Sequence, residues 1–181
     1  MTVTALDPGT ALIVIDLQAG TAGSGMDDVV AHASELLAAF RMRGLPVALV
    51  RVAATPPGRT AHLAGSREFP AAFTEPLPGF APELGDIPIS RRAWSAFGDS
   101  DLHAALRTRG VTQIVLAGVA TSFGIESTAR QGYDLGYAVV IATDAVGDGN
   151  PEAHRQSIER VFPALGQTGT TAEIVALLTG V

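Results

Sequence analysis

Residues that could do chemistry stand at the ends of two apolar runs in the sequence. Asp16 directly follows the apolar run 12–15. A carboxylate there either accepts N–H groups from the next turn or acts as a catalytic or substrate-binding acid. The run 113–120 leads into Thr121, Ser122 and Phe123, with Gly124 behind them. A helix starting at this turn would point its backbone N–H groups at an anion or a developing oxyanion.

A third segment, 91–102, combines two arginines with aromatic side chains. Arg91 and Arg92 are followed by Trp94 and Phe97. Arginines in a turn are often only solvated, but this combination also suits a pocket for a planar or carboxylated ligand. The sequence therefore offers an acid, a helix start and a pair of cations as candidate site elements.

Histidine gives little support for a metal site. The four histidines are His32, His62, His103 and His154, and they form neither an H-x-H nor an H-E-x-x-H motif. Three of them fall on expected helices and are expected to be solvated, whereas His62 falls in a long loop from which it could reach the site. Thr121 and Ser122 have no histidine close in sequence to act as a base, so neither is an obvious nucleophile. We expect no metal and no cofactor.

Buried strands and amphipathic helices position these residues. Continuous apolar runs at 11–17, 45–52, 113–120 and 137–143 are typical of strands buried on both faces of a parallel sheet. Helical spacing marks 26–44, 101–110, 151–162 and 171–178, with Asn150–Pro151 as an N-cap and Thr170 with Glu173 as a capping box. Alternation of the two predicts a doubly wound α/β fold. The proline- and glycine-rich segment 53–86 has no convincing element and is predicted to be a functional or mobile loop.

Composition excludes several classes of function. The chain has 181 residues, 47% apolar and 17% charged, and a net charge of −6. These values favour one domain over 1–181 and argue against nucleic-acid or anionic-membrane partners. The sequence contains no cysteine and no lysine, so thiolate nucleophiles and lysine bases are excluded. No leader or membrane span is visible, and we expect a cytoplasmic protein.

Three ordered motifs resemble those of one family. The segments ALIVIDLQAG (11–20), RRAWSAF (91–97) and GVATSFGIESTARQGYDLGYAVVIATDA (118–145) are similar to segments of the isochorismatase-like hydrolases, the cysteine hydrolase superfamily. The resemblance implies a three-layer α/β/α fold with a six-stranded, mainly parallel sheet and Rossmann-like topology. It also implies homodimers or higher homo-oligomers, and a cis peptide bond between Val119 and Ala120.

The catalytic positions of that family are only partly kept. Asp16 matches the aspartate of the family's Asp–Lys–Cys triad, whereas Arg91 stands where the lysine is expected and Gly124 where the cysteine is expected. Isochorismatases also have glycine there and are thought to cleave a vinyl ether by protonation from the aspartate. We expect Gly124 to leave room for a substrate or water. We also expect the fixed charge of Arg91 to lower the pKa of Asp16.

Three hypotheses remain open at this point. The chain is a cysteine-independent hydrolase of a small, anionic or enol-ether metabolite; a catalytically silent relative that binds a small molecule in the same crevice; or a purely structural subunit. The first is favoured because Asp16 and both framing motifs persist although the nucleophile is gone. The candidate substrate-binding residues are Gln18, Trp94, Phe97, Val119, Ala120, Thr121, Ser122 and Phe123.

Overall fold

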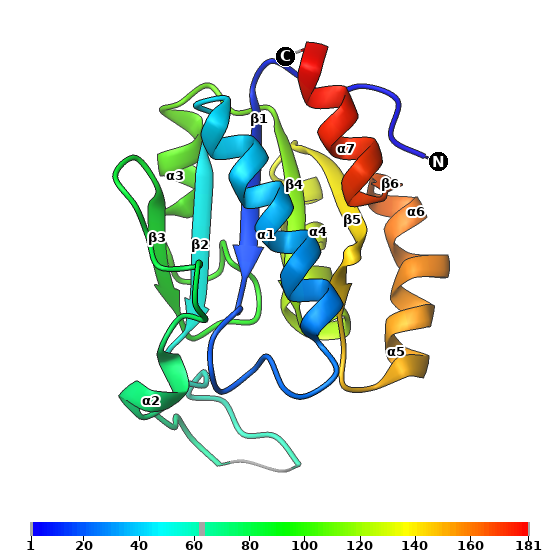
Figure 1. Cartoon of the computed structure of the whole chain (residues 1–181). Coiled ribbons are helices and arrows are strands. Elements are labelled where there is room, and N and C mark those ends of the chain that lie inside the picture. The colour runs from blue at the N-terminus through cyan, green and yellow to red at the C-terminus, as the bar shows by residue number, and fades with distance from the viewer. Residues whose placement is uncertain (1, 62–63, 181) are drawn as a thin grey trace.

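The fold is built on a six-stranded parallel sheet in the order β3-β2-β1-β4-β5-β6. A computed structural model describes residues 2–61 and 64–180. The strands are β1 (Thr10–Ile15), β2 (Val47–Val52), β3 (Ile87–Arg91), β4 (Gln113–Val119), β5 (Ala138–Gly147) and β6 (Gln167–Gly169). Their carboxyl ends point toward the same end of the sheet (Figure 1).

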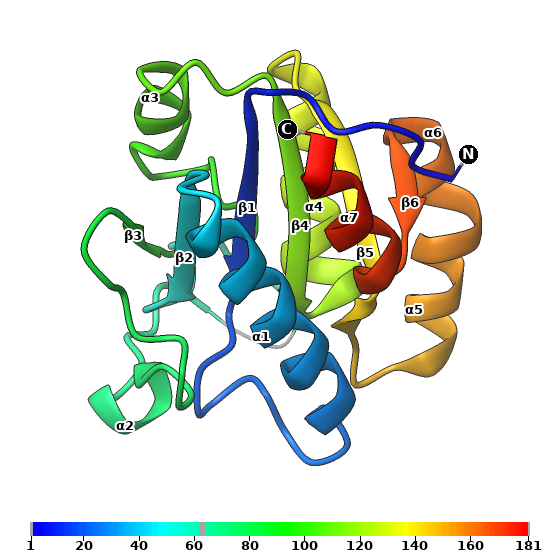
Figure 2. The ribbon, with the colours of Figure 1, turned by 45° about the horizontal axis from the view of Figure 1, so that its top comes forward.

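Helices cover both faces of the sheet (Figures 1 and 2). The α-helices are α1 (Asp27–Met42), α2 (Ala71–Thr74), α3 (Leu102–Arg107), α4 (Glu126–Asp134), α5 (Pro151–Gln156), α6 (Phe162–Leu165) and α7 (Thr171–Leu177). Two π-helical turns, η1 (Thr121–Ile125) and η2 (Ser157–Val161), and the 3₁₀ turn η3 (Leu178–Gly180) extend them. α1 and α7 pack on one face, and α3, α4 and α6 pack on the other. The three-layer α/β/α architecture is confirmed, and the sheet is entirely parallel.

The apolar core forms two clusters, one on each face of the sheet. In β1, Ile13 and Ile15 pack toward the α3–α4 face, whereas Leu12 and Val14 pack toward α1. All six residues of β1 are buried. A strand covered on both faces needs apolar residues at every position, which is why its sequence does not alternate.

The helix starts agree with the sequence prediction where side-chain caps were expected. The Asn150 side chain accepts hydrogen bonds from the Glu152 and Ala153 N–H groups at the start of α5. Thr170 and Glu173 form the capping box that opens α7. Each cap satisfies backbone donors that have no partner inside the helix.

The two edge strands were not predicted. β3 alternates buried and exposed residues because only part of its surface is covered, and β6 is only 3 residues long. Segment 53–86 holds little regular structure before β3. It contains α2 and an isolated bridge between Ala54 and Glu68. Its first part, with α2, lies beyond the carboxyl ends of β2 and β3, and its last part runs back to the amino end of β3 (Figure 1). No helix in the described residues, 2–61 and 64–180, is long and apolar enough to cross a membrane.

Candidate active site

An ion pair between Asp16 and Arg91 forms the centre of the candidate site. Asp16 follows β1, and Arg91 is the last residue of β3, two strands away in the sheet. The Arg91 guanidinium reaches past β2 and donates from Nη2 to Asp16 Oδ2 at 2.8 Å. The two side chains are 75 residues apart in sequence, so the parallel sheet brings them together.

The backbone places the Asp16 side chain in an unusual way. Asp16 has a φ of 54°, the left-handed region that non-glycine residues seldom adopt. Its N–H donates to the Val50 carbonyl, and its carbonyl accepts from the Gln18 N–H and the Thr21 hydroxyl. The residue is 6% exposed, and Oδ1 of its carboxylate is buried without a hydrogen-bond partner in the described chain. One carboxylate oxygen therefore holds Arg91, while the other is buried beside the cavity without a hydrogen bond from the described residues.

Burial raises the pKa of Asp16 to about 6, although the charge and hydrogen bond of Arg91 act in the opposite direction. Arg91 does lower this pKa, as expected, but burial outweighs it and the net shift is upward. The carboxylate loses more stabilisation by leaving water than it gains from one neighbouring cation, because a dry environment disfavours the charged form. Both protonation states of Asp16 are accessible near neutral pH.

Arg91 is held by the turn that follows β3. Its side chain is 1% exposed and also donates from Nη1 to the Ala93 carbonyl. The Asp99 carboxylate accepts the N–H groups of Arg92 and Ala93, which closes this turn. Two hydrogen bonds in fixed directions fit the planar fork of arginine, which an ammonium group would not reproduce.

Gly124 packs directly against the Arg91 guanidinium. A Cβ atom at Gly124 would lie 3.2 Å from Arg91 Nη2 and 3.1 Å from Ile15 Cγ2. Gly124 lines the cavity beside Asp16, but Arg91 and Ile15 take the space into which its own side chain would point. A longer, branched cation takes that space, so Arg91 and Gly124 are sterically matched.

A cavity of about 260 Å³ opens beside the ion pair. Asp16 and Arg91 line its polar part. One wall carries Phe69 and Phe73, stacked with ring centroids 4.4 Å apart. Another carries Trp94 and Phe123, which meet edge to face at 4.9 Å. The arrangement can hold a small planar molecule against a carboxyl group.

Most of the expected site residues line this cavity, but four do not. Those lining it are Asp16, Arg91, Trp94, Val119, Ala120, Phe123 and Gly124. The Val119–Ala120 peptide bond is cis. Those outside it are Gln18, Phe97, Thr121 and Ser122.

Packing and hydrogen bonding explain two of the four exceptions. Phe97 is buried and stacks on Tyr137 at 5.7 Å, so it belongs to the core. Gln18 is buried and clamps Val52, accepting from its N–H and donating to its carbonyl, each at 3.0 Å. It shapes the cavity wall from behind.

The start of η1 is already occupied by a carboxylate of the protein. Asp148 Oδ2 accepts from the Ser122 N–H at 2.8 Å and from the Ser122 hydroxyl at 2.7 Å. Burial alone would raise the pKa of Asp148, but these hydrogen bonds, the Asn150 N–H and nearby His154 lower it. A second anion at the Ser122 N–H would be repelled. The expected anion-binding turn is therefore not available at Ser122.

The three histidines that were expected to be solvated have protein partners. His154 Nδ1 bonds to the Thr121 hydroxyl at 2.9 Å, and Thr121 is fully buried. His103 Nδ1 contacts the Tyr137 hydroxyl, and His32 Nδ1 lies 3.0 Å from the Asp144 carbonyl. His62 lies outside the described residues. Within 2–61 and 64–180, no three His, Cys, Asp or Glu side chains gather as metal ligands would.

Sequence reasoning missed the aromatic wall of Phe69 and Phe73. No periodic pattern marks them, because they lie in segment 53–86, whose position depends on isolated contacts. A separated Asp16 and Arg91 and a crevice filled by aromatic side chains would have favoured the hypothesis of a purely structural subunit. The ion pair and the cavity beside it contradict both conditions.

Comparisons with known proteins agree on one family. Residues 10–173 match the isochorismatase domain. The uncharacterized isochorismatase family protein YecD of Escherichia coli is 40% identical, over 93% of this chain and 96% of that protein. The ureidoacrylate amidohydrolase RutB of Methylobacterium radiotolerans is 31% identical, over 96% and 81%. The structure of an isochorismatase family protein from Burkholderia thailandensis superposes with a TM-score of 0.89 at 35% identity, over 97% and 98%.

Proposed function

The chain belongs to the isochorismatase family, and we propose that it is a hydrolase that works without a covalent nucleophile. Asp16 transfers the proton, Arg91 orients Asp16 and stabilises its carboxylate, and the aromatic walls position a small substrate. The observation that carries the proposal is the buried Asp16 carboxyl, which has one oxygen without a hydrogen bond from the part of the chain that the structure describes and a pKa raised to about 6.

The pKa of Asp16 suits proton transfer. At pH 7 a group with a pKa of about 6 is protonated in roughly one molecule in ten. Proton transfer is most efficient when the pKa of the catalytic group lies near the operating pH. Arg91 stabilises the carboxylate that remains once the proton has left, and it restricts Asp16 to one orientation.

The substrate we propose is a small, planar metabolite that carries an anionic group or an enol ether. A cavity of about 260 Å³ between two aromatic pairs supports a flat molecule of limited size. Arg91 is engaged with Asp16, so the cation that could bind an anionic group of the substrate is Arg92, which also lines this cavity. Arg92 also pairs with Glu68 at 2.8 Å, and both side chains are largely exposed, so this pair is weak and exchangeable.

For an enol ether, protonated Asp16 gives its proton to the terminal vinylic carbon. Water then adds to the carbon bearing the ether oxygen and returns a proton to Asp16. The resulting hemiketal releases an alcohol and leaves a ketone, so the overall reaction consumes one water molecule. Amide hydrolysis through a thioester is closed to this chain because it contains no cysteine. The amidohydrolase relative therefore does not define the reaction.

The opposite assignment makes Asp16 a base that takes a proton from water attacking a carbonyl group. The two roles give opposite pH profiles of kcat/KM, which reports ionisations of the free enzyme. As an acid, Asp16 gives activity that falls as pH rises through about 6; as a base, it gives activity that rises through about 6. Arg91→Met should move either midpoint upward, because the cation lowers this pKa.

The test begins with a panel of small enol ethers, esters and amides, each with and without a carboxylate. We expect turnover of at least one, loss of at least a hundredfold in kcat/KM for Asp16→Asn, and no change for Asp134→Asn on the exposed end of α4. Full activity of Asp16→Asn would refute the mechanism.

A second candidate is a catalytically silent protein that binds a metabolite in the same cavity. The occupied Ser122 N–H and the missing nucleophile favour it, because fewer groups remain to stabilise a reaction intermediate. Calorimetry that shows tight binding of a panel compound, recovered unchanged after long incubation, would support this candidate over the hydrolase.

A further inference from the structure

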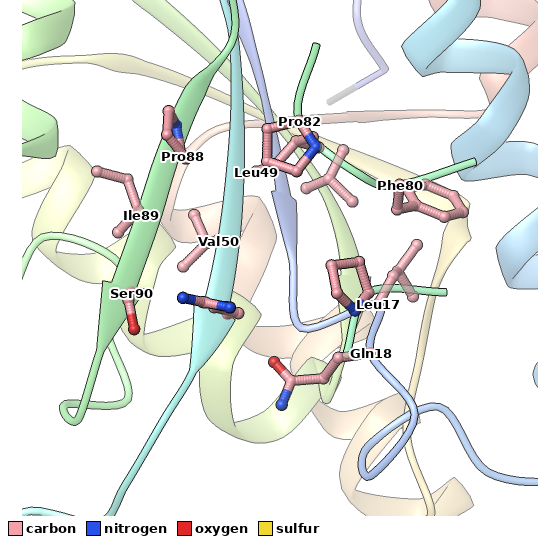
Figure 3. A pocket seen from close by; sticks show the side chains of 12 residues that line it. Leu17, Gln18, Leu49, Val50, Phe80, Pro82, Pro88, Ile89 and Ser90 are labelled. Carbon is pink, nitrogen blue, oxygen red and sulfur yellow. The ribbon is translucent and has the colours of Figure 1, made fainter. Parts of the chain in front are cut away.

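A second cavity, of about 220 Å³, lies on the face of the sheet that carries α1. Its described lining residues are all different from those of the cavity beside Asp16. Figure 3 shows Pro88 and Ser90 of β3 on one side of it, facing Leu17 and Phe80 on the other. No step of the proposed reaction uses this cavity.

The wall of the cavity that faces β3 is held in place by backbone hydrogen bonds and ion pairs. The Leu77 N–H donates to the Leu17 carbonyl, and the Phe80 N–H donates to the Leu77 carbonyl, each at 3.0 Å. Further along the segment, Arg41 pairs with Glu83 at 2.7 Å and with Asp86 at 2.6 Å. A wall fixed at both ends is largely formed before a ligand arrives, which reduces the ordering cost of binding.

The walls are apolar, and a cation stands at one end. In the β2–β3 register, Leu49 lies beside Pro88, and Arg51 lies beside Ser90, on the same face of the sheet. Arg51 is exposed and has no ion-pair partner among residues 2–61 and 64–180. Arg51 therefore differs from Arg41 and Arg91, which are both engaged. An exposed arginine beside an apolar hollow can take a carboxylate in a bidentate pair at little desolvation cost.

The volume limits the size of the ligand. A dry cavity of about 150 Å³ holds benzene, so about 220 Å³ holds one ring or a short branched chain together with a carboxylate. Drug-sized ligands need roughly 300 Å³ or more. We propose that this cavity is a second binding site for a small amphipathic carboxylate, with the apolar body between Leu49 and Phe80 and the anion on Arg51.

Benzoate and its neutral analogue benzamide are suitable probes. We expect benzoate to shift the backbone amide resonances of Leu49, Arg51 and Ser90 in a saturable titration followed by NMR. Arg51→Met keeps the apolar stem and removes the charge. We expect it to weaken benzoate binding about tenfold and to leave benzamide unchanged, as for loss of one charge-assisted hydrogen bond.

Two further variants make the test specific. Arg160→Met removes the same charge from an exposed position on η2 and should not affect benzoate. Ser90→Tyr, at an exposed position of an edge strand, should obstruct the cavity mouth and weaken both probes. The proposal is overturned if benzoate produces no saturable shifts, if its shifts fall on Trp94 and Phe123 instead, or if Arg51→Met weakens both probes equally. None of these readouts depends on turnover, so the result is independent of the proposed reaction.

Discussion

Replacing Gly124 with alanine tests the steric match between this position and Arg91. The new Cβ would lie 3.2 Å from Arg91 Nη2 and 3.1 Å from Ile15 Cγ2, both tighter than ordinary van der Waals contact. Ile15 is fully buried, and Arg91 is 3% exposed, so neither side chain can move into solvent. The guanidinium must shift by a few tenths of an ångström, away from its 2.8 Å hydrogen bond to Asp16.

The expected change in the free energy of unfolding is the balance between the helical preference of alanine and the weakened ion pair. Alanine favours a helical position by about 1 kcal/mol over glycine. Breaking a buried ion pair by removing one partner costs about 3–5 kcal/mol, and a displaced pair loses only part of that. We expect Gly124→Ala to lower the free energy of unfolding by about 1–2 kcal/mol. The pKa of Asp16 should rise further above about 6, because Arg91 lowers it less from a greater distance.

Urea denaturation of a double-mutant cycle isolates this contact. Arg91→Lys removes the branched head group near the new methyl group, so Gly124→Ala should cost at least about 1 kcal/mol less in that background. The Ile15 contact is present in both backgrounds and cancels. Gly149→Ala adds a methyl group where nothing lies within 4 Å and should be nearly neutral. An equal cost of Gly124→Ala in both backgrounds, with an unchanged Asp16 pKa by carboxyl NMR, would refute the steric match.

Two further predictions concern the Asp16 pKa and the Thr128 hydrogen bonds beside the site. The folded-state pKa of Asp16 lies above its ordinary value of 3.8, so its contribution to stability is greatest below about pH 4 and is lost as pH rises through about 6. Relative to Asp16→Asn, wild type should lose up to about 3 kcal/mol over this range in urea titrations, and parallel curves would contradict the assignment. Thr128→Val should cost about 1–3 kcal/mol, because the buried Thr128 hydroxyl accepts from the Ala96 N–H and donates to the Gly124 carbonyl. Thr128→Ser should recover most of this loss, and an equally unstable serine variant would assign the effect to packing.

Local patterns were enough for the central elements of the fold. The runs that became β1, β2, β4 and β5 are apolar at nearly every position, since helices cover both of their faces. The caps at Asn150 and Thr170 involve side chains and backbone within three residues, so their chemistry is visible in a short window. β3 and β6 escaped prediction because an edge strand is only partly covered and has no such pattern.

The sequence predicted which residues form the centre of the candidate site, but not the pKa or the packing of those residues. Resemblance to a family pointed to Asp16, Arg91 and Gly124, and residue types alone excluded a thiolate. The same reasoning identified the lowering effect of Arg91 on the Asp16 pKa but not the net shift, because the balance between an adjacent cation and burial depends on how much water the fold excludes. It also placed Phe97 in the pocket, whereas the ring stacks on Tyr137 in the core.

The sequence alone determined the buried parallel sheet, the main helices, the absence of cysteine and lysine chemistry, and the acid at the end of β1. Only the tertiary structure decided that Arg91 lies where a side chain at Gly124 would point and that the Asp148 carboxylate accepts the Ser122 N–H. It also decided that Arg51 lines an apolar cavity. The physical reason is the distance along the chain over which each kind of interaction acts. Propensities, caps and burial patterns act over a few neighbouring residues, whereas desolvation, steric fit and cavity shape depend on segments that are brought together only by folding.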